Sequence, residues 1–339
     1  MADTTTILLQ KATTSDGTEL DLSMCRDVAL VETMDLSGPR LMLKFDDRFS
    51  MLRNILKLKN GDVLTCTLSD AAHTAELNWT AKFTIMSMPV QPGEIVMLNM
   101  LYKPLADIKT PAVKARLFPK ENYAIMDVVK ALFPGLDKYR TADNETFSLL
   151  NAYHVLPGDR PSMTLRQLAV EHGAMIYVTR GELWLRSVKN VYAQKADDAF
   201  QYNNPQAPHQ VVAFEHINRE KLVADKAIRK YSGFSITDGI VSATSYSSNS
   251  PEGTAFDSPA LMNNLTKIPI PILDIVTWGA GYIAPGRVMD FKWNMDVSYN
   301  DTHLDESLPT HSVIHSVSHY AAGAQNYYCR VKVCVPYGQ

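Results

Sequence analysis

Three histidines with a regular spacing are the first candidates for chemistry. His311, His315 and His319 follow one another at intervals of four residues. On a helix, His311 and His315 would share one face and could bind a common metal ion. On a strand, residues four apart are separated by about 13 Å, which is too far for one ion. The valines and the isoleucine between them favour a strand. The sequence therefore predicts a row of histidines on one strand face, near a subunit interface or a barrel rim, and no metal site.

Carboxylates form the second candidate set. Asp46 and Asp47 are adjacent, and Asp62 and Asp70 lie nearby in sequence. Acid–base catalysis needs two carboxylates that reach one substrate, whereas neighbours on a strand point to opposite faces. We interpret these groups as solvated charges of loops or of a lumen.

Signatures of nucleophilic catalysis and of phosphate binding are missing. The sequence contains no G-x-S-x-G and no S-x-x-K motif. Gly279 and Gly281 form a lone G-x-G in TWGAGYIAPG, which lacks a third glycine and indicates a loop before a strand. We expect no cofactor and no enzymatic activity.

Two functional alternatives remain open. One is a β-rich hydrolase that uses Asp46, Asp62 or His315. The other is a carbohydrate-binding module with tryptophans as stacking platforms. The scatter of the tryptophans over three regions favours core roles instead; they are Trp79, Trp184, Trp278 and Trp293.

Composition indicates an ordinary globular chain. The 339 residues are 46% hydrophobic and 20% charged, and the net charge is −3. This length suggests two or three domains, and the charge balance argues against a nucleic-acid-binding surface. No stretch approaches the roughly 20 apolar residues of a membrane span, and the first ten residues do not resemble a signal peptide, so we expect no stable membrane association. The cysteines at 25, 66, 329 and 334 are expected to be reduced thiols in or near a core.

Alternation of apolar and polar residues predicts several short strands in the first part of the chain, typical of a barrel or sandwich. A short helix over Met51–Leu58 interrupts them. The predicted strands are Thr6–Leu9, Asp27–Met34, Leu41–Phe49, Val63–Leu68, Leu77–Met88 and Glu94–Tyr102.

The middle part predicts a small α+β unit. Residues 103–122, rich in proline and basic residues, are interpreted as a connecting arm. A helix follows with a buried stripe from Ile125 to Phe133 and Asn122 as its cap. A second helix over Thr164–His172, with a capping box at Thr164, leads into a hairpin that turns at Arg180-Gly181.

Strand character returns in the last part. We expect strands over Gln210–His216 and Arg287–Val297, and a broken strand over Phe234–Ser245. Residues 218–230 fit either a helix or an irregular excursion. The chain closes with HSVIHSVSHYAAGAQNYYCRVKVCV, two alternating segments around a turn that contains Gly323, which predicts an antiparallel hairpin.

This closing hairpin resembles that of phage tail baseplate hub proteins and of the hub half of type VI secretion spikes. The run TLRQLAVEHGAMIYVTRGELWL resembles their small peripheral domain. The resemblance implies a mainly β fold with a smaller α+β domain. Two tube-like β-barrel domains, at 1–105 and 199–339, would flank a peripheral helix–hairpin domain at 106–198.

The resemblance also implies a function. Such a chain is a structural component of a phage tail baseplate and forms a homotrimeric hub ring between the hexameric tail tube and the trimeric central spike. Expected partners are the tube or its terminating protein, the spike, other baseplate proteins and, as a further candidate, the tape measure protein; DNA only passes through the lumen. The location would be the virion, after assembly in the bacterial host cytoplasm. Candidate interface residues are His315, His319, Tyr327 and the basic side chains Lys109, Lys114 and Arg116.

Overall fold

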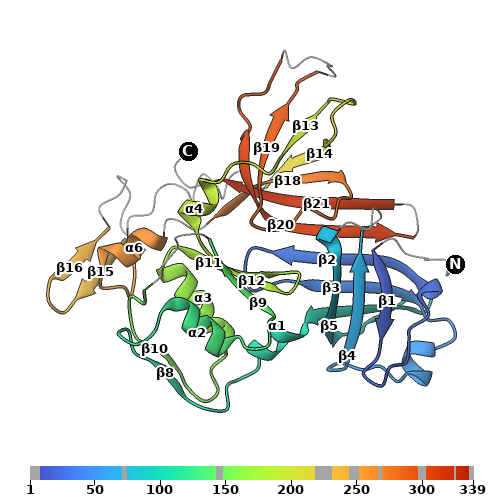
Figure 1. Cartoon of the computed structure of the whole chain (residues 1–339), viewed down its shortest axis with the longest axis horizontal. Helices are drawn as coiled ribbons and strands as arrows, with labels where there is room; N and C mark the ends of the chain where they lie inside the picture. The colour runs from blue at the N-terminus through green and yellow to red at the C-terminus, as the bar shows by residue number, and fades with distance from the viewer. Residues whose placement is uncertain are drawn as a thin grey trace.

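The fold is dominated by one long mixed sheet, in which β13 pairs parallel with its two neighbours and the other pairings are antiparallel. The computed structural model describes residues 8–70, 75–142, 148–217, 231–243, 252–265, 269–296, 303–323 and 326–335. Its largest sheet has the strand order β1-β4-β5-β7-β3-β2-β20-β19-β13-β14-β18-β21. Figure 1 shows the first half of this sheet beside the N-terminus and the second half above it.

The first half of the sheet comes from the first third of the chain. Its strands are β1 (Leu9–Thr13), β2 (Cys25–Thr33), β3 (Arg40–Asp46), β4 (Val63–Ser69), β5 (Asn78–Ser87), β6 (Val90–Gln91) and β7 (Ile95–Tyr102). Short helical turns lie at Leu22–Met24, Met51–Ile55 and Ala75–Leu77. The predicted short helix is confirmed by the π-helical turn over Met51–Ile55.

The second half closes into a six-stranded barrel. It contains β13 (Asp198–Tyr202), β14 (Gln210–His216), β18 (Ile270–Trp278), β19 (Val288–Trp293), β20 (His311–Ala322) and β21 (Asn326–Val335). Pairing of β20 with β21 completes the ring. The predicted closing hairpin is thus confirmed, and so is the mainly β fold class with a smaller α content.

Strand β20 also joins the two halves. It pairs antiparallel with β2 from Thr33↔Ser316 to Asp27↔Ala322, while it pairs with β21 along its other edge. Both edges of β20 are therefore hydrogen-bonded where the two halves meet, so this strand exposes no free edge there. The division at residues 105 and 198 stays a prediction.

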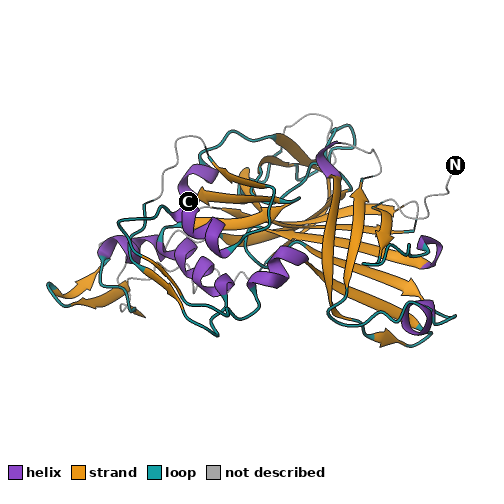
Figure 2. Cartoon of the chain, turned by 60° about the horizontal axis from the view of Figure 1, so that its bottom comes forward, coloured by secondary structure: helices purple, strands orange, loops and turns teal. Residues whose placement is uncertain are grey.

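The α+β unit lies between these halves in sequence. Its helices are α1 (Lys103–Ile108), α2 (Ile125–Leu132), α3 (Pro161–Glu171) and α4 (Val188–Tyr192), and its strands are β8 (Arg116–Phe118), β9 (Lys138–Thr141), β10 (Tyr153–Val155), β11 (Ala174–Thr179) and β12 (Glu182–Ser187). Figure 2 shows the longer helices gathered between the large sheet and a small hairpin at the far end.

Several local predictions for this unit need correction. The supposed connecting arm begins with α1 and contains β8, which pairs with β10. Asn122 does not cap α2; the Asp127 carboxylate instead accepts the N–H of Ala124 at 3.0 Å. Helix α3 starts at Pro161, so Thr164 lies inside it and forms no capping box.

The last insertion lies between β14 and β18. It consists of β15 (Tyr231–Ser235), β16 (Gly239–Ser242), β17 (Glu252–Gly253) and α6 (Pro259–Leu265). The predicted break at Asp238-Gly239 is the turn between β15 and β16. The segment 218–230 lies outside the described residues.

Candidate functional site

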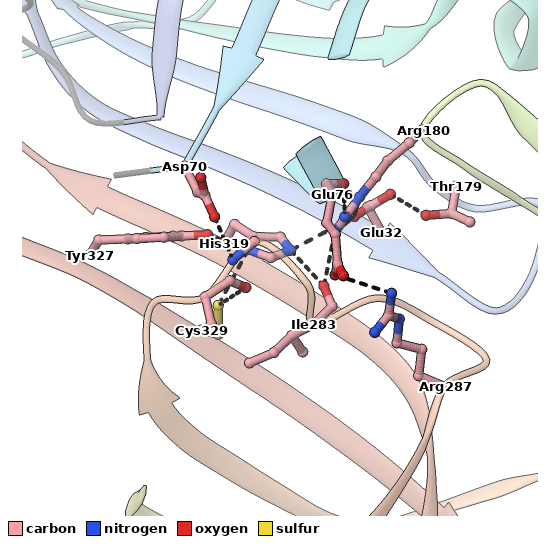
Figure 3. A network of polar contacts seen from close by, with 12 residues as sticks. Glu32, Asp70, Glu76, Thr179, Arg180, Ile283, Arg287, His319, Tyr327 and Cys329 are labelled. Carbon is pink, nitrogen blue, oxygen red and sulfur yellow. Dashed lines mark hydrogen bonds and ion pairs between the residues drawn. The ribbon is translucent and has the colours of Figure 1, made fainter. Parts of the chain in front are cut away.

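A buried polar cluster lies where the two sheet halves and the α+β unit meet (Figure 3). Glu32 on β2 and His319 on β20 are both fully buried. They lie on neighbouring strands, since Leu30 is the register partner of His319. Arg180, at the β11–β12 turn, reaches them from the α+β unit. We call this set, with Asp70, Ile283, Tyr327 and Cys329, the polar junction.

Arg180 connects all three parts of the chain. Its guanidinium donates to the Ile283 carbonyl at 3.0 Å and to the Glu76 carbonyl. Its Nε and Nη2 lie 3.4 Å from Oε2 of Glu32, while Oε1 of Glu32 accepts the Thr179 hydroxyl at 2.7 Å. Arg180 has a φ of 49° and Gly181 one of 83°, which confirms the predicted tight turn and directs the side chain into the junction.

His319 is held as a neutral imidazole. Its Nε2 lies 3.1 Å from the Ile283 carbonyl, which can only accept, so Nε2 carries the proton. Its Nδ1 then accepts from the Tyr327 hydroxyl at 2.8 Å. Burial and the nearby Arg180 cation lower the pKa of His319 to about 3. The 3.7 Å separation from Glu32 is therefore not an ion pair near neutral pH.

A glycine-containing loop completes the junction. The N–H of Gly281 donates to the buried Asp70 carboxylate at 3.0 Å. A Cβ on Gly281 would lie 2.2 Å from Oδ2 of Asp70, so only glycine fits this approach. The G-x-G motif thus serves packing between the sheet halves.

The predicted interface residues occupy different environments. His319 and Tyr327 contact each other inside the junction. His315 lies mostly buried beside Met34 and Asp35, and burial lowers its pKa. Lys109 is half-buried, whereas Lys114 and Arg116 are exposed. Their role in subunit contacts stays a prediction.

The carboxylate prediction was wrong in part. Asp47 is fully buried, where it accepts from Arg53 Nε at 2.8 Å and from the Leu52 N–H at 2.9 Å. Asp70 is buried in the junction rather than solvated. Asp46 pairs with Arg26 and Arg48. Asp47 and Asp70 each follow directly after the last residue of a strand, β3 and β4 respectively, so strand alternation does not indicate that their side chains are buried.

Within the described part of the chain, no group of three or more His, Cys, Asp or Glu side chains could hold a metal ion. No described helix has the length and hydropathy to span a membrane. Trp79 and Trp293 are core residues as predicted, but Trp278 is 54% exposed and stacks on Tyr328.

Sequence reasoning missed Glu32 and Arg180, the centre of the junction. One signal was available. Leu30, Glu32 and Met34 share one face by alternation, and a charged residue between two apolar ones on a core-facing strand indicates a buried partner. The partner itself is 148 residues away and leaves no local pattern.

We expect Arg180→Met to destabilise the protein by about 3–5 kcal/mol, because the Glu32 carboxylate would stay buried without its cation. Urea unfolding measures this. The double variant Arg180→Met/Glu32→Gln should recover part of the loss. Arg140→Met is the matched control, because its pair with Glu182 is solvent-exposed and worth at most about 1 kcal/mol. Equal losses for both single variants would contradict this account.

Gly281→Ala should destabilise the fold by about 1–3 kcal/mol, because the new methyl group overlaps the Asp70 carboxylate. Gly253→Ala is its control, since a Cβ there meets nothing within 4 Å. The free energy of unfolding of both variants decides the matter. A Gly281→Ala protein as stable as the control would show that the loop moves aside freely.

His319 should contribute a pH dependence to stability. Its pKa is about 3 in the folded protein and near 6.5 when unfolded, so between these values only the unfolded chain binds the proton. The contribution is complete above about pH 6.5 and is lost as the pH falls. From pH 6.5 to 5.5, the wild type should lose about 1 kcal/mol more than His319→Gln. Parallel stability curves from urea unfolding would refute this.

Comparisons with known proteins address the fold. Protein-family profiles and curated protein sequences give no match. A tail protein from Neisseria meningitidis superposes with a TM-score of 0.64 at 9% identity, over 98% of this chain and 97% of that one. A 43 kDa tail protein of prophage MuSo2 from Shewanella oneidensis gives 0.60 at 10% identity, over 97% of both chains.

A third structure extends the likeness to secretion systems. A type VI secretion component from E. coli, itself described as similar to bacteriophage T4 tail proteins, gives a TM-score of 0.50 at 11% identity, over 93% of this chain and 74% of that one. These matches confirm the predicted resemblance at the level of the fold: the chain has the fold of phage tail proteins and of a component of a type VI secretion system.

Proposed function

We propose that this chain is a structural component of a phage tail baseplate, and that three copies form a hub ring between the tail tube and the central spike. The observation that carries the proposal is the fold likeness over nearly the whole chain to two phage tail proteins. The role is structural rather than enzymatic. Its location is the tail of the virion, after assembly in the host cytoplasm.

The sheet architecture supports this role. The pairing of β2 with β20 makes one continuous sheet from the two halves of each chain. Three chains would then present six sheet halves, which suits a six-fold tube on one side and a three-fold spike on the other. Large apolar interfaces are typical of such permanent assemblies. Partners in this proposal are the tube, the spike, other baseplate proteins and the tape measure protein.

The hydrolase alternative receives no support from the described residues. Asp46 is neutralised by two arginines, and the carboxylate of Asp62 accepts the Lys59 N–H at the end of a turn. His315 lines a cavity together with Asp35 and contacts neither Asp46 nor Asp62 there. The three candidate groups thus have separate partners among the described residues.

The expected mass of the purified chain is three times 37.8 kDa at high concentration. Native mass measurement over a concentration series, followed by electron microscopy of the largest species, tests this. A three-fold ring with a central channel supports the hub. A chain that stays monomeric at every concentration, alone and when mixed with tail-tube and spike proteins, would overturn the proposal.

A further inference from the structure

A hairpin at one end of the molecule exposes three large apolar side chains. Strands β15 and β16 pair with Phe234 opposite Ile240, and Ile236 lies in the turn between them. Phe234 is 67% exposed, Ile236 98% and Ile240 84%. Figure 1 shows this hairpin projecting at the end of the molecule remote from β1. We call these three side chains the apolar tip.

The hairpin is a defined element with a packed base. A Cβ on Gly233 would lie 1.9 Å from the Phe256 carbonyl oxygen and 2.7 Å from the end of Met262 on α6, so the backbones are in direct contact. The Ser235 hydroxyl accepts the N–H groups of Thr237 and Asp238, both at 3.2 Å, which fixes the turn. The apolar tip is therefore presented on a fixed support.

The same chain has an apolar cavity of about 360 Å³. It lies between the segment after β2, helices α3 and α6, and strand β11. Its apolar lining includes Met34, Leu36, Leu165, Ala169, Met175 and Val188. A cavity of this size and lining is suited to more than one aliphatic or aromatic side chain.

Charges at the cavity rim complement the hairpin. Arg166 lines the cavity, is exposed, and has no hydrogen bond or ion pair to any described residue. Arg40 donates from Nε to the carbonyl of Ser37, which also lines the cavity, at 2.7 Å. Burial, followed by the nearby Arg40 and Arg166 cations, lowers the pKa of Lys109. The nearby acid, Asp35, is already bonded to Thr33 and Ser37.

The hairpin supplies the opposite charge. Asp238 is exposed, lies two residues from Ile236, and is the only charged residue between Tyr231 and Ala243. Each chain therefore carries two surfaces that complement each other in polarity and in charge: the apolar tip with Asp238, and the cavity with Arg166.

We propose that the apolar tip of one copy docks in this cavity of a second copy, with Asp238 against Arg166. The two surfaces differ, so the contact is heterologous, and repetition of it closes a ring when the rotation between copies allows. This inference rests on the proposed function in one respect: the number of copies in the ring, three, is taken from the proposed hub. It adds the surfaces by which the copies recognise one another.

Cross-linking between two single-cysteine variants tests the contact directly. All four native cysteines are buried, so an introduced surface thiol reacts selectively. Asp238→Cys mixed with Arg166→Cys should form a covalent dimer under mild oxidation, and neither variant alone should. Asp238→Cys mixed with Lys82→Cys is the control, because Lys82 is exposed on β5. A yield no higher than in the control mixture overturns the docking.

Charge exchange and tip substitution give a second test by native mass. Arg166→Asp and Asp238→Arg should each weaken assembly, and the double exchange should restore it. Ile236→Asp should raise the concentration at half-assembly by about tenfold or more, as expected for a central contact. Phe49→Asp, at a site that is 81% exposed, is the matched control and should change nothing.

The outcomes separate this inference from the proposed function. If the wild type forms a trimer, the Ile236→Asp variant assembles equally well and no specific cross-link forms, the docking proposal is overturned while the proposed hub function stands. Specific cross-linking with a native mass other than three copies supports the docking and overturns the trimer. A chain that neither assembles nor cross-links overturns both.

Discussion

The burial of one carboxylate constrains how the three parts of this chain meet. Glu32 lies on the core face of β2, and pairing of β2 with β20 removes it from solvent. A buried carboxylate is costly unless a cation and hydrogen-bond donors accompany it. The β11–β12 turn supplies both through Arg180 and Thr179. The α+β unit is thereby fixed against the seam of the large sheet.

The same burial explains why His319 is neutral. Burial of the ring, and then the Arg180 cation beside it, disfavour the charged imidazolium, which is the reason the pKa of His319 falls. The neutral ring instead serves as a hydrogen-bonded spacer between Ile283 and Tyr327. Within the junction, the Glu32 carboxylate is thus paired with one cation from a distant segment, while His319 is joined to Ile283 and Tyr327 by neutral hydrogen bonds.

Sequence patterns predicted the elements whose stability is local. The closing hairpin, the β11–β12 turn and strand β14 follow from alternation and turn residues. Strand β18 was missed because Pro269 and Pro271 interrupt its start, although it lies inside the barrel between β14 and β21. Proline is tolerated there because the pairing with β21 shifts register between Pro271 and Leu273.

The junction could not be predicted in the same way, because its members come from segments far apart in sequence and their types are ordinary. Asp47 shows the difficulty on a smaller scale. Its burial depends on the π-helical turn that brings Arg53 and the Leu52 N–H around it, and no periodicity indicates that geometry.

The placement of the insertions shows where the fold can change without loss of the barrel. Strands β14 and β18 are hydrogen-bonded neighbours, so the segment that carries β15, β16 and α6 leaves and returns at nearby points. An insertion between paired strands need not disturb barrel closure, since its ends are already held together. Many combinations of apolar side chains with a similar total volume can fill the barrel core. This is why two phage tail proteins share the fold of this chain at sequence identities of 9% and 10%. Features that distinguish one assembly from another can therefore accumulate in such insertions, where a change of side chain alters a contact surface and leaves the sheet intact.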